Sequence, residues 1–248
     1  PKYILILAGD HIYKMDYAEM ILDHIRMGSP LTVACIPVER SKATAFGVMK
    51  IDNDNLITDF MEKPQDPPPM PGDDTKSLAS MGIYVFDADY LYDILQKDSE
   101  TPGSHRDFGM DIIPALVKER KAHAHNFAKS CIRNRGDKNL VYWRDVGTID
   151  AYWEANMDIA SIEPQLDVYD FDWPIWTYQP QNPPAKFVQD INGTSTIVRN
   201  SVCSSGCIIS GSSVNQSVLF HSVRVHSNCF LSESVISPFC IIHRDISV

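Results

Sequence analysis

The chain has 248 residues, a formal net charge of −10 and 44% hydrophobic residues. This much apolar material suffices for one large domain or two ordinary ones, and it excludes disorder as the main state. The acidic balance argues against a general nucleic-acid binder, and no apolar run approaches the ~20 residues that span a bilayer. The six cysteines are spread over residues 35 to 240, without a tight framework. We therefore expect reduced thiols in a cytoplasmic protein.

The two ends of the chain predict that it is an internal piece of a longer protein. The sequence begins at Pro1 and enters an apolar run at once, and it stops at Val248 within a repeating pattern. It shows neither the charged segment nor the apolar core of a signal peptide.

Short apolar runs alternate with helical periods over the first 150 residues or so. The expected strands are Tyr3–Ala8, Leu31–Val38, Gly47–Ile51, Leu56–Met61 and Met81–Phe86. The expected helices are Asp16–Met27, Asp87–Lys97 and Asp111–Lys121, of which the last two open with an aspartate that favours a helix N-terminus. This alternation predicts an α/β sheet with substantial parallel pairing. Pro64–Pro71 is rich in proline and is expected to be a surface loop.

Beyond this region the composition changes twice. Asn156–Ile191 contains a proline-rich and aromatic stretch without a clear period. It is expected to be a connector whose Trp173 and Trp176 are buried. Residues 192–248 are rich in Ser, Val, Ile, Asn and Cys. The predicted domains are therefore residues 1–155, a linker at 156–191 and a repeat domain at 192–248.

Apolar residues recur six apart in this last region, which predicts a β-helix whose coils are built from hexads. The positions are Val202, Ile208, Val214 and Phe220, followed after a shift in phase by Phe230, Ile236, Ile242 and Val248. A β-sandwich of short strands is the alternative that periodicity leaves open.

Two aspartates follow expected strands. Asp10 comes directly after the first apolar run, and Asp145 comes after Leu140–Arg144 and before Gly147. Ligands of open α/β sheets bind beyond the carboxyl ends of strands, so two carboxylates there could hold a hard cation such as Mg²⁺. The simpler interpretation is that each aspartate caps a turn or the following helix.

Other polar groups at the ends of elements are weaker signals. Lys63 ends a strand and could meet a phosphate as a compact charge, although a solvated lysine before a proline loop is the simpler interpretation. Ser80–Tyr84 and Asp107–Gly109 add small and polar groups at further boundaries.

The repeat region carries one closely spaced pair of cysteines and three histidines. Cys203 and Cys207 lack a second cysteine pair, which favours simple thiols over a metal site. His221, His226 or His243 could serve an acyltransferase as a base, but a structural role is the simpler interpretation.

Six segments together give a more specific signal. They are residues 9–14 (GDHIYK), 46–49 (FGVM), 60–64 (FMEKP), 80–86 (SMGIYVF), 107–114 (DFGMDIIP) and 143–153 (WRDVGTIDAYW). In this order they resemble the bacterial glucose-1-phosphate adenylyltransferases, over essentially the whole chain. The resemblance implies an incomplete nucleotidyltransferase domain with a dinucleotide-fold-like mixed sheet, followed by a partial left-handed β-helix. It also implies an allosteric homotetramer that makes ADP-glucose and pyrophosphate from ATP and α-D-glucose 1-phosphate for glycogen synthesis.

The resemblance assigns roles to individual residues. Asp10 matches the catalytic, metal-binding aspartate, and Asp145 matches the second Mg²⁺ ligand. Four residues match contacts to the sugar phosphate: Gly47, Glu62, Lys63 and Ser80. Three more are expected to line the glucose pocket: Tyr84, Asp107 and Trp143.

Elementary chemistry agrees with these roles. A phosphate oxygen of the sugar phosphate attacks the α-phosphorus of ATP, and because both are anionic a divalent ion must screen them. Lys63 would offset the charge of the sugar phosphate, Glu62 would accept hydrogen bonds from sugar hydroxyls, and Gly47 would permit close approach.

The departure from the family pattern that matters most is the absence of the glycine-rich loop that binds the triphosphate. We therefore do not expect this piece alone to bind ATP productively. Two alternatives stay open: an enzyme for another nucleotide or sugar phosphate, and a non-catalytic regulatory subunit. The presence of Asp10, Lys63 and Asp145 argues against the subunit.

Overall fold

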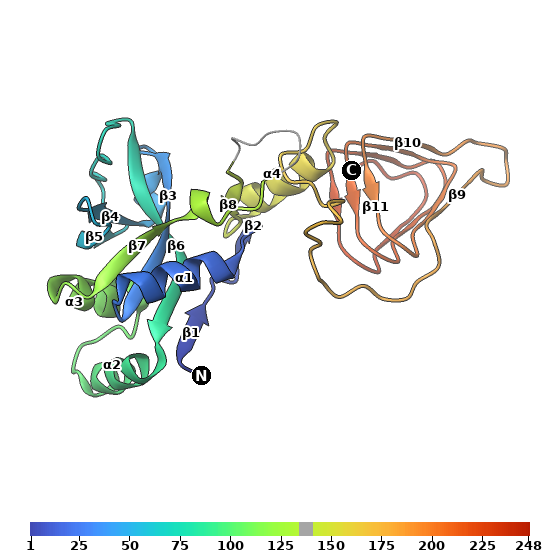
Figure 1. Ribbon diagram of the computed structural model, residues 1–248. Helices are drawn as coiled ribbons and strands as arrows, with labels where there is room; N and C mark the ends of the chain where they lie inside the picture. Colours follow the sequence, from blue (N-terminus) through green and yellow to red (C-terminus); the bar gives the residue numbers. More distant parts are fainter. Residues whose placement is uncertain (134–140) are drawn as a thin grey trace. The chain divides into compact units, whose positions relative to one another are not determined.

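The computed structural model describes residues 1–133 and 141–248 (Figure 1). Leu140, the first residue of the strand expected before Asp145, lies outside the described residues. The chain divides into two compact units. Unit 1 comprises Pro1–Gly9 and Lys14–Ile132, and unit 2 comprises Asp10–Tyr13 and Arg133–Val248.

Unit 1 is built on a mixed six-stranded sheet. Its strands are β1 (Tyr3–Ile6), β3 (Leu31–Glu39), β4 (Gly47–Ile51), β5 (Ile57–Glu62), β6 (Lys76–Asp87) and β7 (Ala122–Asn126). Their order is β5-β4-β6-β3-β7, with β1 also paired to β6. The mixed sheet confirms the predicted fold class, but the expectation of substantial parallel pairing is wrong. Among the described pairs of this sheet, β3 with β7 is parallel and the others are antiparallel.

The antiparallel pairs follow from two features of the chain. A tight turn joins β4 to β5, in which the Asp52 side chain accepts hydrogen bonds from the backbone N–H groups of Asp54 and Leu56. A turn this short can only join antiparallel strands. The long strand β6 then runs antiparallel to three neighbours, β1, β3 and β4.

The helices of unit 1 are α1 (Tyr17–Met27), α2 (Ala88–Glu100) and α3 (Ile113–Lys118), the last preceded by a wide helical turn at Phe108–Ile112. The expected helix start at Asp111 is wrong. Asp107 caps the turn instead, because its Oδ1 accepts hydrogen bonds from the backbone N–H groups of Gly109 at 2.7 Å and Met110 at 2.9 Å. Asp111 points back and accepts from the N–H of Asp107.

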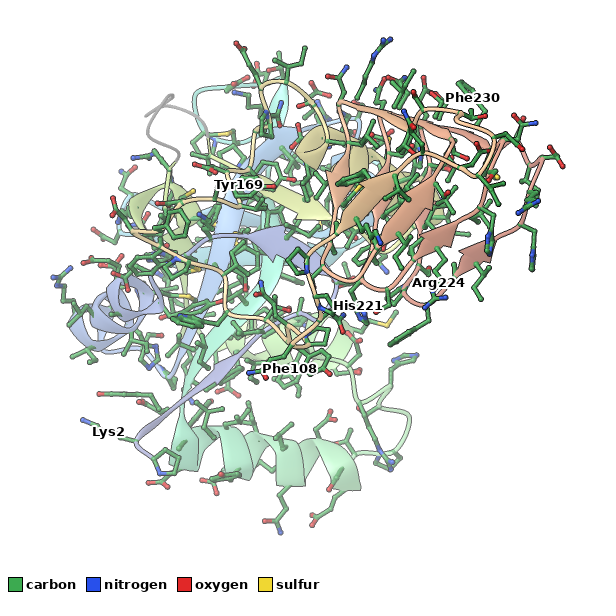
Figure 2. All side chains as sticks on the ribbon, turned by 90° about the vertical axis from the view of Figure 1, so that its right-hand side faces the viewer. Lys2, Phe108, Tyr169, His221, Arg224 and Phe230 are labelled. Atoms are coloured by element: carbon green, nitrogen blue, oxygen red, sulfur yellow. The ribbon has the colours of Figure 1, made fainter. Side chains whose placement is uncertain are left out.

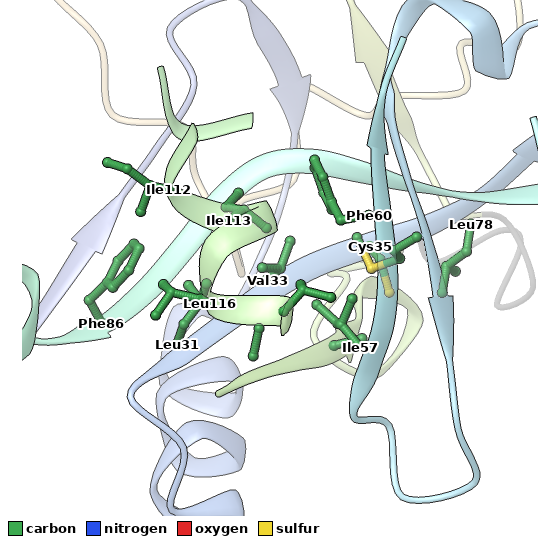
Figure 3. Packing of buried hydrophobic residues seen from close by; sticks show 14 of the residues in the cluster. Leu31, Val33, Cys35, Ile57, Phe60, Leu78, Phe86, Ile112, Ile113 and Leu116 are labelled. Carbon is green, nitrogen blue, oxygen red and sulfur yellow. The ribbon is translucent and has the colours of Figure 1, made fainter. Parts of the chain in front are cut away.

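The core of unit 1 fixes the elements that carry the site. Figure 3 shows Ile113 and Leu116 of α3 packed among side chains of β3, β5 and β6. Leu31, Phe60 and Phe86 are buried in the same cluster. This packing holds the end of β5 and the turn before α3 in place. The Pro64–Pro71 segment lacks a named helix or strand, as predicted, and Arg40 donates to the Pro67 carbonyl.

Unit 2 contains a strand pair, a helix and a coil of short parallel strands (Figure 1). Its first elements are β2 (His11–Tyr13), β8 (Trp143–Asp145) and α4 (Ile149–Ile159). The strands of the coil are β9 (Lys186–Val188), β10 (Ile197–Arg199), β11 (Val202–Cys203), β12 (Ile208–Ser210), β13 (Ser213–Asn215), β14 (Val218–Leu219), β15 (Arg224–Val225), β16 (Phe230–Ser232), β17 (Val235–Ile236) and β18 (Ile241–Ile242).

The coil strands form three parallel sheets, with orders β10-β13-β16, β11-β14-β17 and β18-β15-β12-β9. Each strand pairs with the strand one coil later, as Val198 does with Val214 and Val214 with Leu231. This is the predicted β-helix, and the parallel pairing rejects the sandwich alternative, whose sheets are antiparallel. The coil begins earlier than the expected residue 192, because β9 pairs with β12.

The inward row of the coil differs from the one predicted at several positions. The buried row comprises Ile209, Val214, Leu219, Val225, Leu231 and Ile236. Val214 and Ile236 were predicted correctly, but Val202 and Phe220 pack on the outside against Met157 and Ala160 of α4. Phe230 is 51% exposed and is labelled in Figure 2. The sequence thus carries two apolar rows, one for the coil interior and one for α4, and periodicity alone does not separate them.

The connector differs from its prediction in burial. Trp176 is 91% exposed and Trp173 is 38% exposed. Prolines at positions 174, 180, 183 and 184 interrupt the backbone pairing that would give these rings a neighbouring strand to pack on. No helix in the described part of the chain is both long and apolar enough to cross a membrane.

Candidate functional site

The pairing of β2 with β8 brings the two predicted metal-binding aspartates together in unit 2. The strands are antiparallel, with His11 opposite Asp145, and the N–H of Val146 donates to the Asp10 carbonyl at 2.9 Å. A Cβ added to Gly147 would lie 3.0 Å from Asp145 Oδ1 and 3.3 Å from Asp10 Oδ2. Both carboxylates therefore border the same small space beside Gly147.

Local hydrogen bonds orient this acidic pair. The backbone N–H of Gly147 donates to Asp145 Oδ1 at 2.7 Å, so Asp145 also makes the turn that the simpler interpretation predicted. The Nε2 atom of His11 lies 3.5 Å from Asp10 Oδ1 and 3.9 Å from Asp145 Oδ2. Asp10 is well exposed and Asp145 about one-third exposed, which leaves carboxylate oxygens open to a ligand.

The donor set fits a magnesium ion. Mg²⁺ is usually held by one or two carboxylates, with water and substrate phosphates completing its octahedron. Two carboxylates border one point here, which matches this pattern of protein ligands. Cys203 and Cys207, the closely spaced pair of the repeat region, are free thiols. Burial raises the pKa of Cys203 to about 11 and also raises that of Cys207.

The predicted sugar-phosphate residues gather at the end of the β4–β5 hairpin in unit 1. Gly47 begins β4 and pairs with Glu62, the last residue of β5. Lys63 follows with a φ of 46°, and its N–H donates to the Phe46 carbonyl at 3.1 Å. This left-handed turn ends the strand directly after Glu62 and leaves the lysine side chain exposed.

Two glycines leave room for the carboxylate of Glu62. A Cβ on Gly47 would lie 2.9 Å from Glu62 Oε2, and a Cβ on Gly109 would overlap the same oxygen. Burial raises the pKa of Glu62, the positive charge of Lys63 opposes this rise, and the negative charge of Asp107 adds to it. The carboxylate is thus partly desolvated and faces both a cation and a second acid.

Ser80 and Tyr84 join the same group from β6. A bulge opposite β3 separates them, with Gly82 at a φ of 66°, and the ring of Tyr84 lies 5.6 Å from that of Phe108. Burial raises the pKa of Tyr84, and its hydrogen bond with Ser80 opposes the rise. The charges of Glu62 and Asp107 also act on Tyr84, so the structure brings these four predicted residues together.

Trp143 lies in unit 2, where its ring meets His11 edge-on at 5.0 Å. Sequence reasoning assigned no role to His11, Gly109 or Gly147. The only signal for them was their position inside the motifs, next to aspartates or two residues beyond them.

Comparison with known proteins supports the motif-based resemblance. The family described as Nucleotidyl transferase matches residues 1–162, and the family described as GlmU-like, C-terminal hexapeptide matches residues 183–248. Over 237 residues the chain is 56% identical to a protein named glucose-1-phosphate adenylyltransferase from Enterobacter sp. (strain 638). The match covers 96% of this chain and 55% of the relative, so the chain spans about half the relative's length.

Proposed function

Because the chain belongs to the nucleotidyl transferase family, we propose that it forms part of a glucose-1-phosphate adenylyltransferase. The reaction joins ATP and α-D-glucose 1-phosphate to give ADP-glucose and pyrophosphate. The observation that carries the proposal is the pairing of β2 with β8, which gives Asp10 and Asp145 a common ligand space beside Gly147. The identity of 56% to the named relative supports the choice of substrates.

Asp10 and Asp145 are proposed to hold Mg²⁺, with Asp10 as the catalytic aspartate. When bound, the ion supplies the positive charge that screens the sugar phosphate from the triphosphate. The protein's own contribution is to fix the carboxylates in advance. The N–H of Gly147 orients Asp145, and the backbone bond from Val146 to Asp10 keeps the two residues adjacent.

Lys63 and Glu62 are proposed to bind the two ends of glucose 1-phosphate. The exposed ammonium of Lys63 offsets the phosphate charge, and the turn at φ 46° sets the direction in which the side chain leaves the strand. The partly desolvated carboxylate of Glu62 accepts hydrogen bonds from sugar hydroxyls. Gly47 lets the backbone approach the ligand, since it has no Cβ to fill the space beside Glu62.

Ser80, Tyr84 and Asp107 are proposed to complete the sugar pocket with hydroxyl and carboxylate groups. Their common electrostatic neighbourhood with Glu62 supports this role. The role of Trp143 in binding glucose stays a prediction from the resemblance; within unit 2 its ring packs on His11.

The full-length protein is further proposed to be a cytoplasmic homotetramer in glycogen synthesis under allosteric control. The resemblance of the motifs supports this assembly, and the six cysteines are free thiols, as in most cytoplasmic proteins. Analytical ultracentrifugation of the full-length protein tests the assembly.

The activity is tested by pyrophosphate release from glucose 1-phosphate and Mg²⁺ with each nucleoside triphosphate. The assay uses the full-length protein that contains these residues. Asp10→Asn should lower turnover by ~100-fold or more, whereas Asp54→Asn, in the exposed turn after β4, should not. Lys63→Ala should chiefly raise the KM for glucose 1-phosphate, with Lys42→Ala as its control because Lys42 pairs with Glu39 on the surface.

Other outcomes of the pyrophosphate-release assay would change the proposed function in specific ways. Release with a different nucleotide would keep the mechanism and change the substrate. An effect of Lys63→Ala confined to ATP would move this lysine to another site. The absence of release from a well-folded protein, with or without effectors, would favour a regulatory subunit.

A further inference from the structure

His11 lies at the centre of the acidic pair but has no role in the proposed mechanism so far. It begins β2, directly after Asp10 and opposite Asp145. Its side chain is 9% exposed, although one ring nitrogen faces both carboxylates at 3.5 and 3.9 Å. A nearly buried imidazole between two acids therefore needs an explanation beyond the hydrophobic packing of a short strand.

The orientation of the His11 ring is fixed by packing. The ring of Trp143, from β8, meets it at a centroid distance of 5.0 Å and an interplanar angle of 74°. Edge-to-face contacts of this kind favour one ring orientation. Trp143 is two residues before Asp145 on the same strand, so the contact ties the ring to the strand that carries the second carboxylate.

The burial of Nδ1 determines which nitrogen of neutral His11 carries the proton. Nδ1 is fully buried and has no hydrogen-bond partner among residues 1–133 and 141–248. An N–H group there would have no acceptor, which is costlier than a lone pair without a donor. The proton of the neutral ring therefore belongs on Nε2, the nitrogen that faces the two carboxylates.

We propose that His11 is a positioning residue for the metal site. Its Nε2–H group directs the oxygens of Asp10 and Asp145 toward one point, although their negative charges repel each other. The Gly147 N–H already orients Asp145 Oδ1, so His11 supplies the corresponding restraint on Asp10 and on the other oxygen of Asp145. This inference rests on the proposed function, because it takes the two aspartates to be metal ligands.

The test measures Mn²⁺ binding by the full-length protein directly, from the electron paramagnetic resonance signal of free Mn²⁺. His11→Phe keeps a ring against Trp143 and removes the donor, whereas His11→Gln places an amide N–H near the position of Nε2. Loss of a residue that orients a ligand typically weakens metal affinity by roughly 10-fold to 100-fold. We expect a loss of this size in the His11→Phe variant. In the His11→Gln variant we expect Mn²⁺ affinity to fall by no more than roughly 2-fold to 5-fold, which is one-third of the same loss on a logarithmic scale.

The Mg²⁺ concentration for half-maximal activity should shift in the same order, with a smaller change in turnover at saturating metal. Wild-type Mn²⁺ affinity in His11→Phe, or equal losses in the Phe and Gln variants, would overturn the proposal, since the second result indicates packing alone. If His11→Phe does not fold, His11→Asn replaces it, because the shorter amide cannot reach the position of Nε2.

A parallel measurement on Asp10→Asn separates this inference from the proposed function. Loss of Mn²⁺ binding in Asp10→Asn together with normal binding in His11→Phe would reject the role of His11 alone. Normal binding in Asp10→Asn would reject the metal site itself and the inference with it.

Discussion

Replacement of Gly47 by alanine tests how tightly the end of the β4–β5 hairpin is packed. The new Cβ would lie 2.5 Å from Cζ of Phe60 and 3.1 Å from its Cε1, whereas carbon atoms in contact prefer ~3.5–4.0 Å. The ring of Phe60 therefore has to move by about 1 Å to restore contact. Phe60 is buried in the core of unit 1, where close packing resists such a shift.

The expected loss of unfolding free energy is about 1–3 kcal/mol, the usual range for overpacked cores. A gain of about 0.4–1 kcal/mol, from the smaller freedom of the unfolded alanine chain, partly offsets it. Gly9→Ala measures that gain separately, because a Cβ at Gly9 would meet nothing within 4 Å. Chemical denaturation followed by circular dichroism gives both values.

A double-mutant cycle identifies the cause of the loss. Phe60→Leu removes the ring edge that the new methyl group meets, so Gly47→Ala should be less destabilising in this background by about 0.5–3 kcal/mol. The same loss in both backgrounds, or a loss no larger than that of Gly9→Ala, would refute the steric argument. Gly47→Ala should raise the KM for glucose 1-phosphate in either background, because the methyl group still enters the space beside Glu62.

Three further predictions concern the coil and the two carboxylate groups. Leu231→Ala should lower the unfolding free energy by about 2–5 kcal/mol, whereas Phe230→Ala, at a half-exposed neighbour, should have a much smaller effect. Equal losses of stability in thermal unfolding would contradict the assignment of Leu231 to the buried row of the coil. Burial raises the pKa of Glu62 in the folded state. The contribution of this carboxyl group to stability is therefore fully present below its pKa in the unfolded state, and it is lost as the pH rises through its pKa in the folded state. The wild type should lose stability relative to Glu62→Gln over this range, and a difference independent of pH would contradict the assignment. Asp145→Asn retains an oxygen for the Gly147 N–H, so its unfolding temperature should stay near that of the wild type while its Mn²⁺ affinity falls. Asp145→Ala should lower both the unfolding temperature and the Mn²⁺ affinity.

The sequence predicts strands well where apolar residues alone determine them. Gly47–Ile51 was predicted with its observed bounds. The strand β6 is longer than the predicted Met81–Phe86, because it also includes the polar residues Lys76, Ser77 and Ser80. These residues become strand through pairing with β3, a tertiary contact that no local pattern records.

The site was predictable to the extent that motifs place reactive groups at strand ends. Asp10 and Asp145 were predicted as metal ligands in this way, but the position of His11 beside both of them was not. That contact exists because β2 pairs with β8, two strands of three residues each that are far apart in the sequence. Strands this short carry too few residues for a periodic signal, so neither the register nor the neighbours of each aspartate could be inferred.

The same short sequence, Asp-x-Gly, occurs in both groups of carboxylates, once at Asp107 beside Glu62 and once at Asp145 beside Asp10. Asp107 and Asp145 are each followed, two residues later, by a glycine whose N–H donates to the aspartate Oδ1 at 2.7 Å. A Cβ on Gly109 would lie 3.3 Å from the Asp107 oxygen, and a Cβ on Gly147 would lie 3.0 Å from the Asp145 oxygen. The turn thus fixes one oxygen of each aspartate and does not engage the other.

The glycine of each turn also makes room for a second acid. The space beside Gly147 is bordered by Asp10, and the space beside Gly109 is bordered by Glu62, so a methyl group in either place would push a carboxylate aside. Two negative charges are kept near each other in both cases, which is unfavourable unless a cation or a hydrogen-bond donor comes between them. The two pairs of carboxylates have different neighbours: the charge of Lys63 acts on Glu62, whereas Asp10 faces the imidazole of His11. The Asp-x-Gly sequences that begin at Asp107 and Asp145 therefore each indicate a paired carboxylate and not only a turn.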